Sequence, residues 1–422
     1  MSRRLTSGLC AIVLGALVVA GCGGDDSDGG PVTLTWFIAL QPGGGPQTIA
    51  DRCSEESNGR YEIELELLPT DADTQREQLV RRLGAEDDSI DIVGMDVIWT
   101  GEFANAGWIL EMPSATEQVV TKNVFDSVLE TAQFEDTFYA APLWSNTQLL
   151  WYRKDRVDTA PKTWDELIDA AEEIGPEEGI IQVQANLYEG LTVWANALIG
   201  SAGTEILSGP EEIVLEQEPT ERALEVMGRL STSPVAAPDI TTSDEDSGRL
   251  AFQEGTSSFQ INYPFVLPSA EAEAPDVAKQ MEAAPFPRID PNQESAPPLG
   301  GFNLAVSAFS DYPEESFEAI ECLVSSENQL EIATAEGLPP VRQDLYDQKA
   351  IDKIYPGYAE LIRTSIENGF PRPSEAPAYQ DLSLGVQRAL HPTTDIDPED
   401  PGLTYDELLE RVEQAVAREG LL

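Results

Sequence analysis

The 422-residue chain carries 76 acidic and 25 basic residues, so its formal net charge is −51 at pH 7. Charge repulsion of this size argues against nucleic acid or an anionic membrane surface as a binding partner, whereas a salt-rich habitat or a need for solubility would explain it equally well. Hydrophobic residues make up 41% of the chain, which is enough apolar surface for a globular protein.

The N-terminal segment has the pattern of a secreted lipoprotein. A basic start precedes an apolar run over 9–20 that is too short to cross a bilayer as a helix, and small residues fit signal-peptidase cleavage before Cys22. We expect a signal peptide over 1–21, a lipid on Cys22 and a flexible tether over 22–31. An ordinary secretory signal with an incidental cysteine is the alternative. The protein is then expected outside the cytoplasm, lipid-anchored to the outer face of the cell membrane.

The rest of the chain alternates β-branched or aromatic runs with amphipathic stretches at helical spacing. Its first three segments predict the order strand, helix, strand, and a later strand ends in Asp96, where carboxylates of α/β sheets face ligands. The predicted fold class is α/β, with two lobes because about 400 residues exceed one hydrophobic core. The predicted strands cover 32–38, 61–67, 90–96, 257–261 and 303–306, and the predicted helices cover 48–57, 73–83, 164–174, 223–230 and 405–417.

Four cysteines leave two for the folded protein. Cys10 would leave with the signal peptide and Cys22 would carry the lipid, so Cys53 and Cys322 remain. In an oxidising compartment these two predict one disulfide. Two separately buried thiols are the alternative, because the sequence does not show that their Cα atoms come close.

Common catalytic and cofactor motifs are missing. The chain has one histidine, His391, which leaves no second imidazole for a zinc site or a catalytic pair, and we expect it at the surface. No phosphate-binding loop or dinucleotide fingerprint occurs, so no cofactor and no metal are expected. Glycoside hydrolases use a pair of carboxylates, and a chain with 76 acidic residues contains many possible pairs. A surface glycoside hydrolase is therefore the enzymatic alternative.

Short motifs follow one another along most of the chain. They are DIVGMDVIW at 91–99, EFANAGW at 102–108, YAAP at 139–142, NTQLLWYR at 146–153, PKTWDEL at 161–167, YEGLT at 188–192, GGFNLAV at 300–306 and GLPP at 337–340. In this order and spacing they resemble the extracytoplasmic sugar-binding proteins of ABC importers. They resemble the maltose- and trehalose-binding branch in particular. The pattern at 96–104, together with Arg372-Pro373, is similar to its trehalose-binding lipoprotein subgroup.

This resemblance implies a periplasmic-binding-protein fold with a hinge, whose two lobes close around a sugar without making or breaking a bond, so no enzyme is expected. By analogy the first lobe would hold 32–142 and 264–325, and the second 143–263 and 326–422. The expected ligand is a disaccharide, trehalose first and maltose next, which a monomer delivers to ABC permease subunits in the membrane. An oligosaccharide or a glycerol phosphate diester is the alternative solute.

The resemblance also places ligand-binding residues. Asp96 is expected to accept hydrogen bonds from two sugar hydroxyls with its carboxylate; the alternative is that it caps a helix. Asn146 is expected to bind the sugar with its side-chain amide; the alternative is a position in a turn. These two residues fall in different predicted lobes, as closure around a ligand requires. Arg372 lies between two prolines and is expected to donate hydrogen bonds from its guanidinium to neighbouring sugar hydroxyls. The alternative is a solvated position on the surface. Tyr263 is the expected stacking platform, where the branch favours Trp. The alternative for the remaining candidates is a solvated position, a position in the core or a position in a turn. These candidates are Gln41, Gln75, Trp144, Tyr188, Glu189, Trp194, Gly301 and Gly337.

Overall fold

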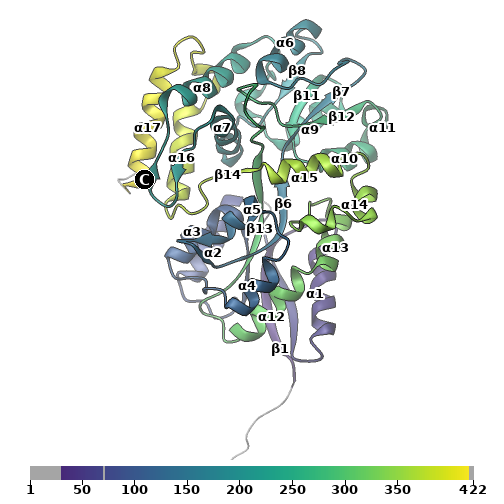
Figure 1. Cartoon of the computed structure of the whole chain (residues 1–422), viewed down its shortest axis with the longest axis vertical. Coiled ribbons are helices and arrows are strands. Elements are labelled where there is room, and N and C mark those ends of the chain that lie inside the picture. The colour runs from purple at the N-terminus through teal and green to yellow at the C-terminus, as the bar shows by residue number, and fades with distance from the viewer. Residues whose placement is uncertain (1–29, 70–71, 418–422) are drawn as a thin grey trace, which may run out of the picture.

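The structure is a computed structural model that describes residues 30–69 and 72–417. Two lobes follow one another along the long axis of the molecule, and each has its own β-sheet with helices packed around it (Figure 1). The predicted signal peptide and the lipidation site at Cys22 lie outside the described residues. Within the described part, no helix is both long and apolar enough to cross a membrane.

The first sheet has six strands: β1 (Val32–Ala39), β2 (Tyr61–Leu68), β3 (Ile92–Asp96), β6 (Ala141–Thr147), β13 (Pro298–Val306) and β14 (Phe370–Pro371). Their order is β14-β13-β3-β1-β2, and β6 also pairs with β13. β1 is parallel to β2 and β3, whereas β13 is antiparallel to β3 and β6. Parallel neighbours need a crossover helix, which α1 (Gly45–Glu56) supplies between β1 and β2 as predicted.

The second sheet has four strands: β7 (Leu149–Arg153), β8 (Ile180–Gln182), β11 (Ser257–Asn262) and β12 (Met281–Ala284). Their order is β12-β7-β11-β8. Only Gln148 separates β6 from β7, so the chain passes there directly from the first sheet to the second. Residues 285–297 connect β12 to β13 and return the chain to the first sheet. Two short pairs complete the strands: β4 (Gln133–Phe134) with β5 (Thr137–Phe138), and β9 (Leu207–Ser208) with β10 (Glu212–Ile213).

Helices cover both sheets (Figure 1). Around the first sheet lie α1, α2 (Ala72–Leu83), α3 (Thr100–Asn105), α4 (Ser114–Val120), α5 (Asp126–Leu129), α12 (Pro313–Leu323) and α13 (Ser326–Glu336). Around the second lie α6 (Trp164–Ile174), α7 (Glu189–Ala202), α8 (Gln217–Thr232), α9 (Glu245–Gln253), α10 (Val266–Glu273), α11 (Pro275–Ala278), α16 (Tyr379–Leu390) and α17 (Gly402–Val416). Between the lobes lie α14 (Lys349–Ile354) and α15 (Ala359–Glu367), the latter against β6. Short 3-10 turns are η1 (Val97–Trp99), η2 (Glu130–Ala132), η3 (Ile240–Thr242), η4 (Gln343–Leu345) and η5 (Thr393–Asp395).

The predicted strands and helices are present because local signals define them, although α8 begins six residues and β13 five residues before the predicted start. For example, α6 begins at the predicted residue because the Thr163 hydroxyl accepts a hydrogen bond from the Glu166 backbone N–H at 3.1 Å. The predicted closing helix is α17, which buries Leu408 and Val412 on one face.

Several segments lie elsewhere than the predicted lobe boundaries place them. Residues 143–147 of β6 and all of β14 pair with β13 in the first sheet, whereas the prediction assigns them to the second lobe. β12 pairs with β7 in the second sheet, whereas the prediction assigns 264–325 to the first lobe. α13 packs against α1, where Arg52 donates to Asn328 at 2.6 Å, whereas the prediction assigns 326–422 to the second lobe. The boundaries stay a prediction, and these contacts favour moving each of these segments to the other lobe.

The predicted disulfide is present. Cys53 of α1 and Cys322 of α12 are bonded, with Cα atoms 5.9 Å apart. The alternative of two separate thiols is therefore wrong. The bond joins two helices of the first lobe that are 269 residues apart in the chain.

Candidate functional site

A buried arginine connects the two lobes. Arg372 lies in the strap, which we define as residues 370–376, directly after the pairing of β14 with β13. Its Nη2 atom is 3.3 Å from Asp96 Oδ1 at the end of β3, and its Nη1 atom is 2.5 Å from Glu189 Oε1 at the start of α7. The Arg372 side chain is only 5% exposed, so its predicted surface alternative is wrong. One guanidinium thus holds a carboxylate from each lobe.

Helix α16 completes this arrangement. The Tyr379 hydroxyl donates to Glu189 Oε1, and the Ser383 hydroxyl donates to Glu189 Oε2 at 2.6 Å. The guanidinium carbon of Arg372 also lies 6.0 Å from the centroid of the Tyr379 ring. We call Asp96, Glu189, Arg372, Tyr379 and Ser383 the Arg372 cluster. Charge-assisted hydrogen bonds of this kind are short and hold their partners in a defined geometry.

Close contacts with both lobes hold the strap in place. The Gly101 backbone N–H at the start of α3 donates to the Ser374 carbonyl at 3.1 Å. On the side of the second lobe, the Asn196 amide donates to the Pro371 carbonyl at 3.2 Å. Because prolines on either side of Arg372 also restrict the backbone, its guanidinium is positioned before any ligand arrives.

Asp96 fills the capping role that the sequence left open, whereas its contact with sugar hydroxyls stays a prediction. Its Oδ1 atom accepts from the Ile98 backbone N–H at 3.2 Å, which caps η1, and also from Arg372. Burial raises the pKa of Asp96, while the charge of Arg372 acts in the opposite direction. The Oδ2 atom accepts no hydrogen bond from the described residues, so it is available to a ligand.

A second group of polar side chains surrounds Tyr263, which follows β11. The Tyr188 hydroxyl donates to Glu245 at 2.8 Å, and Gln148 Nε2 donates to Gln184 Oε1 at 2.9 Å. Burial, followed by the charge of Glu245, raises the pKa of the Tyr263 hydroxyl. We call Tyr188, Glu245, Gln148, Gln184 and Tyr263 the Tyr263 cluster.

The two clusters are neighbours. Arg372 and Asp96 both act electrostatically on the Tyr263 hydroxyl, which also lies beside Gln148. The Gln148 Oε1 atom is buried and accepts no hydrogen bond from the described residues. A buried acceptor without a partner is costly, so this oxygen favours a ligand or water that donates to it.

Asn146 lies beside the Arg372 cluster, but in another place than predicted. It belongs to β6, opposite Gly300 of β13, so it lies in a strand and its turn alternative is wrong. A Cβ atom at Gly300 would be 3.7 Å from both Arg372 Nη2 and Asn146 Cβ. Because β6 and β3 share the first sheet, Asp96 and Asn146 do not face each other across the lobes. The pair that does so is Asp96 and Glu189.

The other polar candidates have varied surroundings. Gln41 is half-buried in the loop after β1, and its side chain makes no hydrogen bond with the described residues. Gln75 is 3% exposed on α2. His391 is partly exposed, with its Nε2 atom 2.9 Å from the Thr241 carbonyl.

Both tryptophan candidates are buried. Trp144 is 2% exposed and stacks on Phe302, with the ring centroids 5.0 Å apart. Trp194 is fully buried and packs against Trp164. Trp194 is therefore a core residue, which is the alternative that its apolar context left open.

The two glycine candidates have structural reasons of their own. Gly301 has φ of 140°, and a Cβ atom there would lie 2.2 Å from the Trp144 carbonyl oxygen of the paired strand. Gly337 ends α13 with φ of 70°. Gly337 also lines a cavity of about 540 Å³, together with Pro264 and Tyr358.

Five residues of the two clusters were not expected from the sequence: Gln148, Gln184, Glu245, Tyr379 and Ser383. The sequence could have indicated Gln148 as a site residue, since it lies inside the motif at 146–153. The others had none, because each is an ordinary polar residue of a helix or strand end, and only the folding of distant segments brings them together.

Several carboxyl groups of this region have raised pKa values. Burial raises the pKa of Glu130, Glu205 and Glu375, which line a cavity of about 190 Å³ against the strap, and the neighbouring carboxylates raise that of Glu130 further. Burial also raises the pKa values of Asp96 and Glu245. Closely placed carboxyls that are partly shielded from water resist ionisation because their charges lose hydration and repel one another.

These shifts predict that the protein is more stable in mild acid than at neutral pH. A carboxyl with a raised pKa in the folded state binds its proton more tightly there than in the unfolded chain. Its contribution to stability is therefore full below about pH 4.3 and is lost as the pH rises through the folded-state pKa. Carboxyls with lowered pKa values, such as Asp87 beside Ser89 and Asp155 beside Arg153, lose their contribution only as the pH falls below about 4. We expect the free energy of unfolding to rise from about pH 7 to about pH 5.

Urea unfolding at constant ionic strength measures this dependence. Glu130→Gln should reduce the slope of stability against pH. Glu173→Gln, which removes an exposed carboxylate from α6, should leave the slope unchanged. A stability that falls steadily from neutral pH to pH 5 would contradict the prediction.

The chain is similar to known proteins over most of its length. Residues 54–330 match the family of bacterial extracellular solute-binding proteins. A probable ABC transporter-binding protein of Deinococcus radiodurans is 26% identical over 346 residues, covering 78% of this chain and 81% of the relative. The diacetylchitobiose binding protein DasA of Streptomyces coelicolor is 23% identical over 368 residues, covering 82% and 83%. Among solved structures, maltose-bound T. maritima MalE3 has a TM-score of 0.78 at 24% identity, covering 92% of this chain and 99% of that one.

Proposed function

Because the chain belongs to the bacterial extracellular solute-binding proteins, we propose that it captures a disaccharide, trehalose first and maltose next, for an ABC importer. The sugar would bind between the lobes, and the loaded protein would deliver it to permease subunits in the membrane. No bond of the sugar is made or broken in this cycle.

The observation that carries the proposal is the Arg372 cluster. It places a carboxylate of the first lobe and a carboxylate of the second on one buried guanidinium. A ligand that bonds to Asp96 Oδ2 and to groups of the second lobe contacts both halves at once. Such contacts stabilise the closed arrangement relative to the open one, which is what capture by lobe closure requires.

The neighbouring groups suit a sugar. Hydroxyls need donors and acceptors in fixed positions. The clusters offer the Asp96 Oδ2 atom and Gln148 Oε1, and the Asn146 amide lies beside them; none of these groups has a hydrogen-bond partner among the described residues. The half-buried Tyr263 ring provides a flat apolar face. Pro264, the residue after Tyr263, and Gly337 line a cavity of about 540 Å³, which is in the usual size range of ligand pockets, although no residue of the two clusters lines it.

The names of the similar proteins also support capture of a sugar. One is named for binding diacetylchitobiose, one is named as an ABC transporter-binding protein, and the solved structure contains maltose. A monomer anchored by a lipid on Cys22 at the outer face of the cell membrane would keep the loaded protein near the permease. The strong acidity of the chain fits a partner other than nucleic acid.

Calorimetric titration of the mature chain tests the ligand. Calorimetry suits this protein better than tryptophan fluorescence, because six tryptophans are fully buried and a ligand need not contact them. We expect saturable binding of trehalose or maltose by the wild type. Asp96→Asn should weaken binding by about 2 kcal/mol, since it loses a hydrogen bond to a charged acceptor.

Asp88→Asn is the matched control, because it removes an exposed aspartate a few residues before β3. The titration should include maltotriose and a glycerol phosphate diester, and the recovered sugar should be analysed for cleavage. Tight binding of the phosphodiester alone would replace the disaccharide by another solute. Cleavage of the recovered sugar would favour the glycoside hydrolase.

A further inference from the structure

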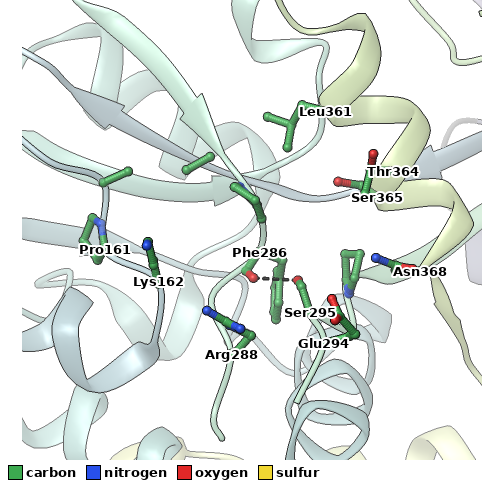
Figure 2. Close-up of a pocket in the computed structure, with 14 residues that line it drawn as sticks. Pro161, Lys162, Phe286, Arg288, Glu294, Ser295, Leu361, Thr364, Ser365 and Asn368 are labelled. Carbon is green, nitrogen blue, oxygen red and sulfur yellow. Dashed lines mark hydrogen bonds between the residues drawn. The ribbon is translucent and has the colours of Figure 1, made fainter. Parts of the chain in front are cut away.

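A cavity of about 360 Å³ lies apart from the Arg372 and Tyr263 clusters, and none of their residues lines it. Its walls come from the loop before α6, from the crossover of residues 285–297 and from α15 (Figure 2). The cavity therefore sits where the chain returns from the second sheet to the first. Nothing in the proposed sugar site uses these residues.

Two basic side chains line one side of the cavity. Lys162 and Arg288 form no ion pair within the part of the chain that the structure describes, although the chain has about three acidic residues for each basic one. The Arg288 guanidinium donates through Nη1 to the carbonyls of Pro291 and Gln293, both at 3.2 Å, and its Nη2 and Nε atoms donate to no described residue. Glu294 also lines the cavity, but it forms no ion pair with either cation within the described residues, so both cations are available to an anion from outside.

The backbone holds these two cations side by side. The Arg288 N–H donates to the Lys162 carbonyl at 3.0 Å, and the Trp164 N–H donates to the Arg288 carbonyl at 2.9 Å. Substituting either side chain leaves both of these backbone hydrogen bonds in place. The positions of the charges thus depend on main-chain contacts and not on an ion pair.

The opposite wall offers hydrogen-bonding groups. Thr364, Ser365 and Asn368 lie on one face of α15 or directly after it, and Figure 2 shows them across the cavity from Lys162 and Arg288. The side chains of these three residues make no hydrogen bond with the described residues. Hydroxyl and amide groups that face a cavity without partners suit a ligand that carries a hydroxyl of its own.

The surfaces between the two polar walls are apolar. Pro161, Phe286 and Leu361 line them, and Phe286 is 1% exposed to solvent. A volume of about 360 Å³ is at the small end of the range for ligand pockets. We propose that this cavity binds a small ring-containing carboxylate with a hydroxyl group, whose anion lies against Lys162 and Arg288 and whose hydroxyl faces α15.

The test uses the mature chain and two probes of the same shape. One probe is 4-hydroxybenzoate, which carries the negative charge, and the other is uncharged 4-hydroxybenzamide. Titration followed by ligand-observed NMR or calorimetry should show saturable binding of the benzoate, with the benzamide at least about tenfold weaker because an ion pair in a partly buried pocket contributes strongly.

Three substitutions locate the binding. Lys162→Gln should weaken the benzoate about threefold, because the Lys162 side chain is exposed and its charge is screened by solvent, whereas Glu294→Gln, which removes the exposed carboxylate at the rim, should strengthen it by a similar factor. Lys122→Gln is the matched control, because Lys122 is an exposed lysine outside this cavity without an ion pair to a described residue, and it should change nothing. Circular dichroism checks that each variant is folded.

The outcomes separate cleanly. Absence of saturable benzoate binding overturns the proposal, as does equal binding of the benzoate and the benzamide. Equal effects of Lys162→Gln and Lys122→Gln also overturn it, because the anion would then lie elsewhere. Benzoate binding that persists in saturating trehalose, and that depends on Lys162, supports a site separate from the sugar site; the proposal does not depend on which sugar the protein binds.

Discussion

Replacing Arg372 with Ala is expected to abolish sugar binding and to lower the free energy of unfolding by about 3 kcal/mol, even without sugar. The guanidinium is 5% exposed and lies between Asp96 and Glu189, whose side chains are 18% and 17% exposed. Its removal leaves two carboxylates with little hydration and no cation beside them. Breaking a buried ion pair from one side is costly for this reason, whereas forming it adds little net stability.

Urea unfolding and sugar titration of the same variant measure the two effects. Arg411→Ala is the matched control: Arg411 is one-third exposed and pairs with Glu407 one helical turn away on α17, so the expected change is less than about 1 kcal/mol. Combining Arg372→Ala with Glu189→Gln should recover part of the lost stability, because one uncompensated charge is removed. Equal stability of the Arg372 and Arg411 variants would show that the lobes do not depend on this contact.

Breaking the Cys53–Cys322 disulfide is expected to lower the free energy of unfolding by about 5 kcal/mol in the chain-entropy model. The bond restricts the unfolded chain by closing a loop between residues 269 positions apart, and long loops gain most from closure. In the folded protein it joins α1 to α12, which pack against each other in the first lobe. Its loss therefore acts mainly through the unfolded state.

Two versions of the experiment separate the cross-link from packing. Cys53→Ser with Cys322→Ser removes the bond but also places a hydroxyl at position 53, which is fully buried. Reduction of the wild type removes the bond and keeps both sulfurs, so it reports the cross-link alone. We expect the reduced wild type to account for most of the loss in the double variant. A loss below about 1 kcal/mol on reduction would contradict the entropic explanation.

The predicted strands and helices agree with the structure because their signals are local. The apolar run at the start of β1, the Thr163 cap of α6 and the spaced apolar residues of α17 all act over a few neighbouring positions. The lobe to which a segment belongs has no such signal. β12 and α13 lie apart from their predicted lobes because their partners, β7 and α1, are distant in the chain.

The sequence by itself determined the α/β class, the extracellular solute-binding family and the candidates Asp96, Tyr263 and Arg372, because each depends on local periodicity or on motifs within short stretches. Only the tertiary structure decided which groups meet. Arg372 reaches Glu189 and Asp96 across 183 and 276 residues of chain. Its burial between them, and the presence of Asn146 in the first sheet, depend on how the strap and the crossing strands pack, which no local pattern encodes.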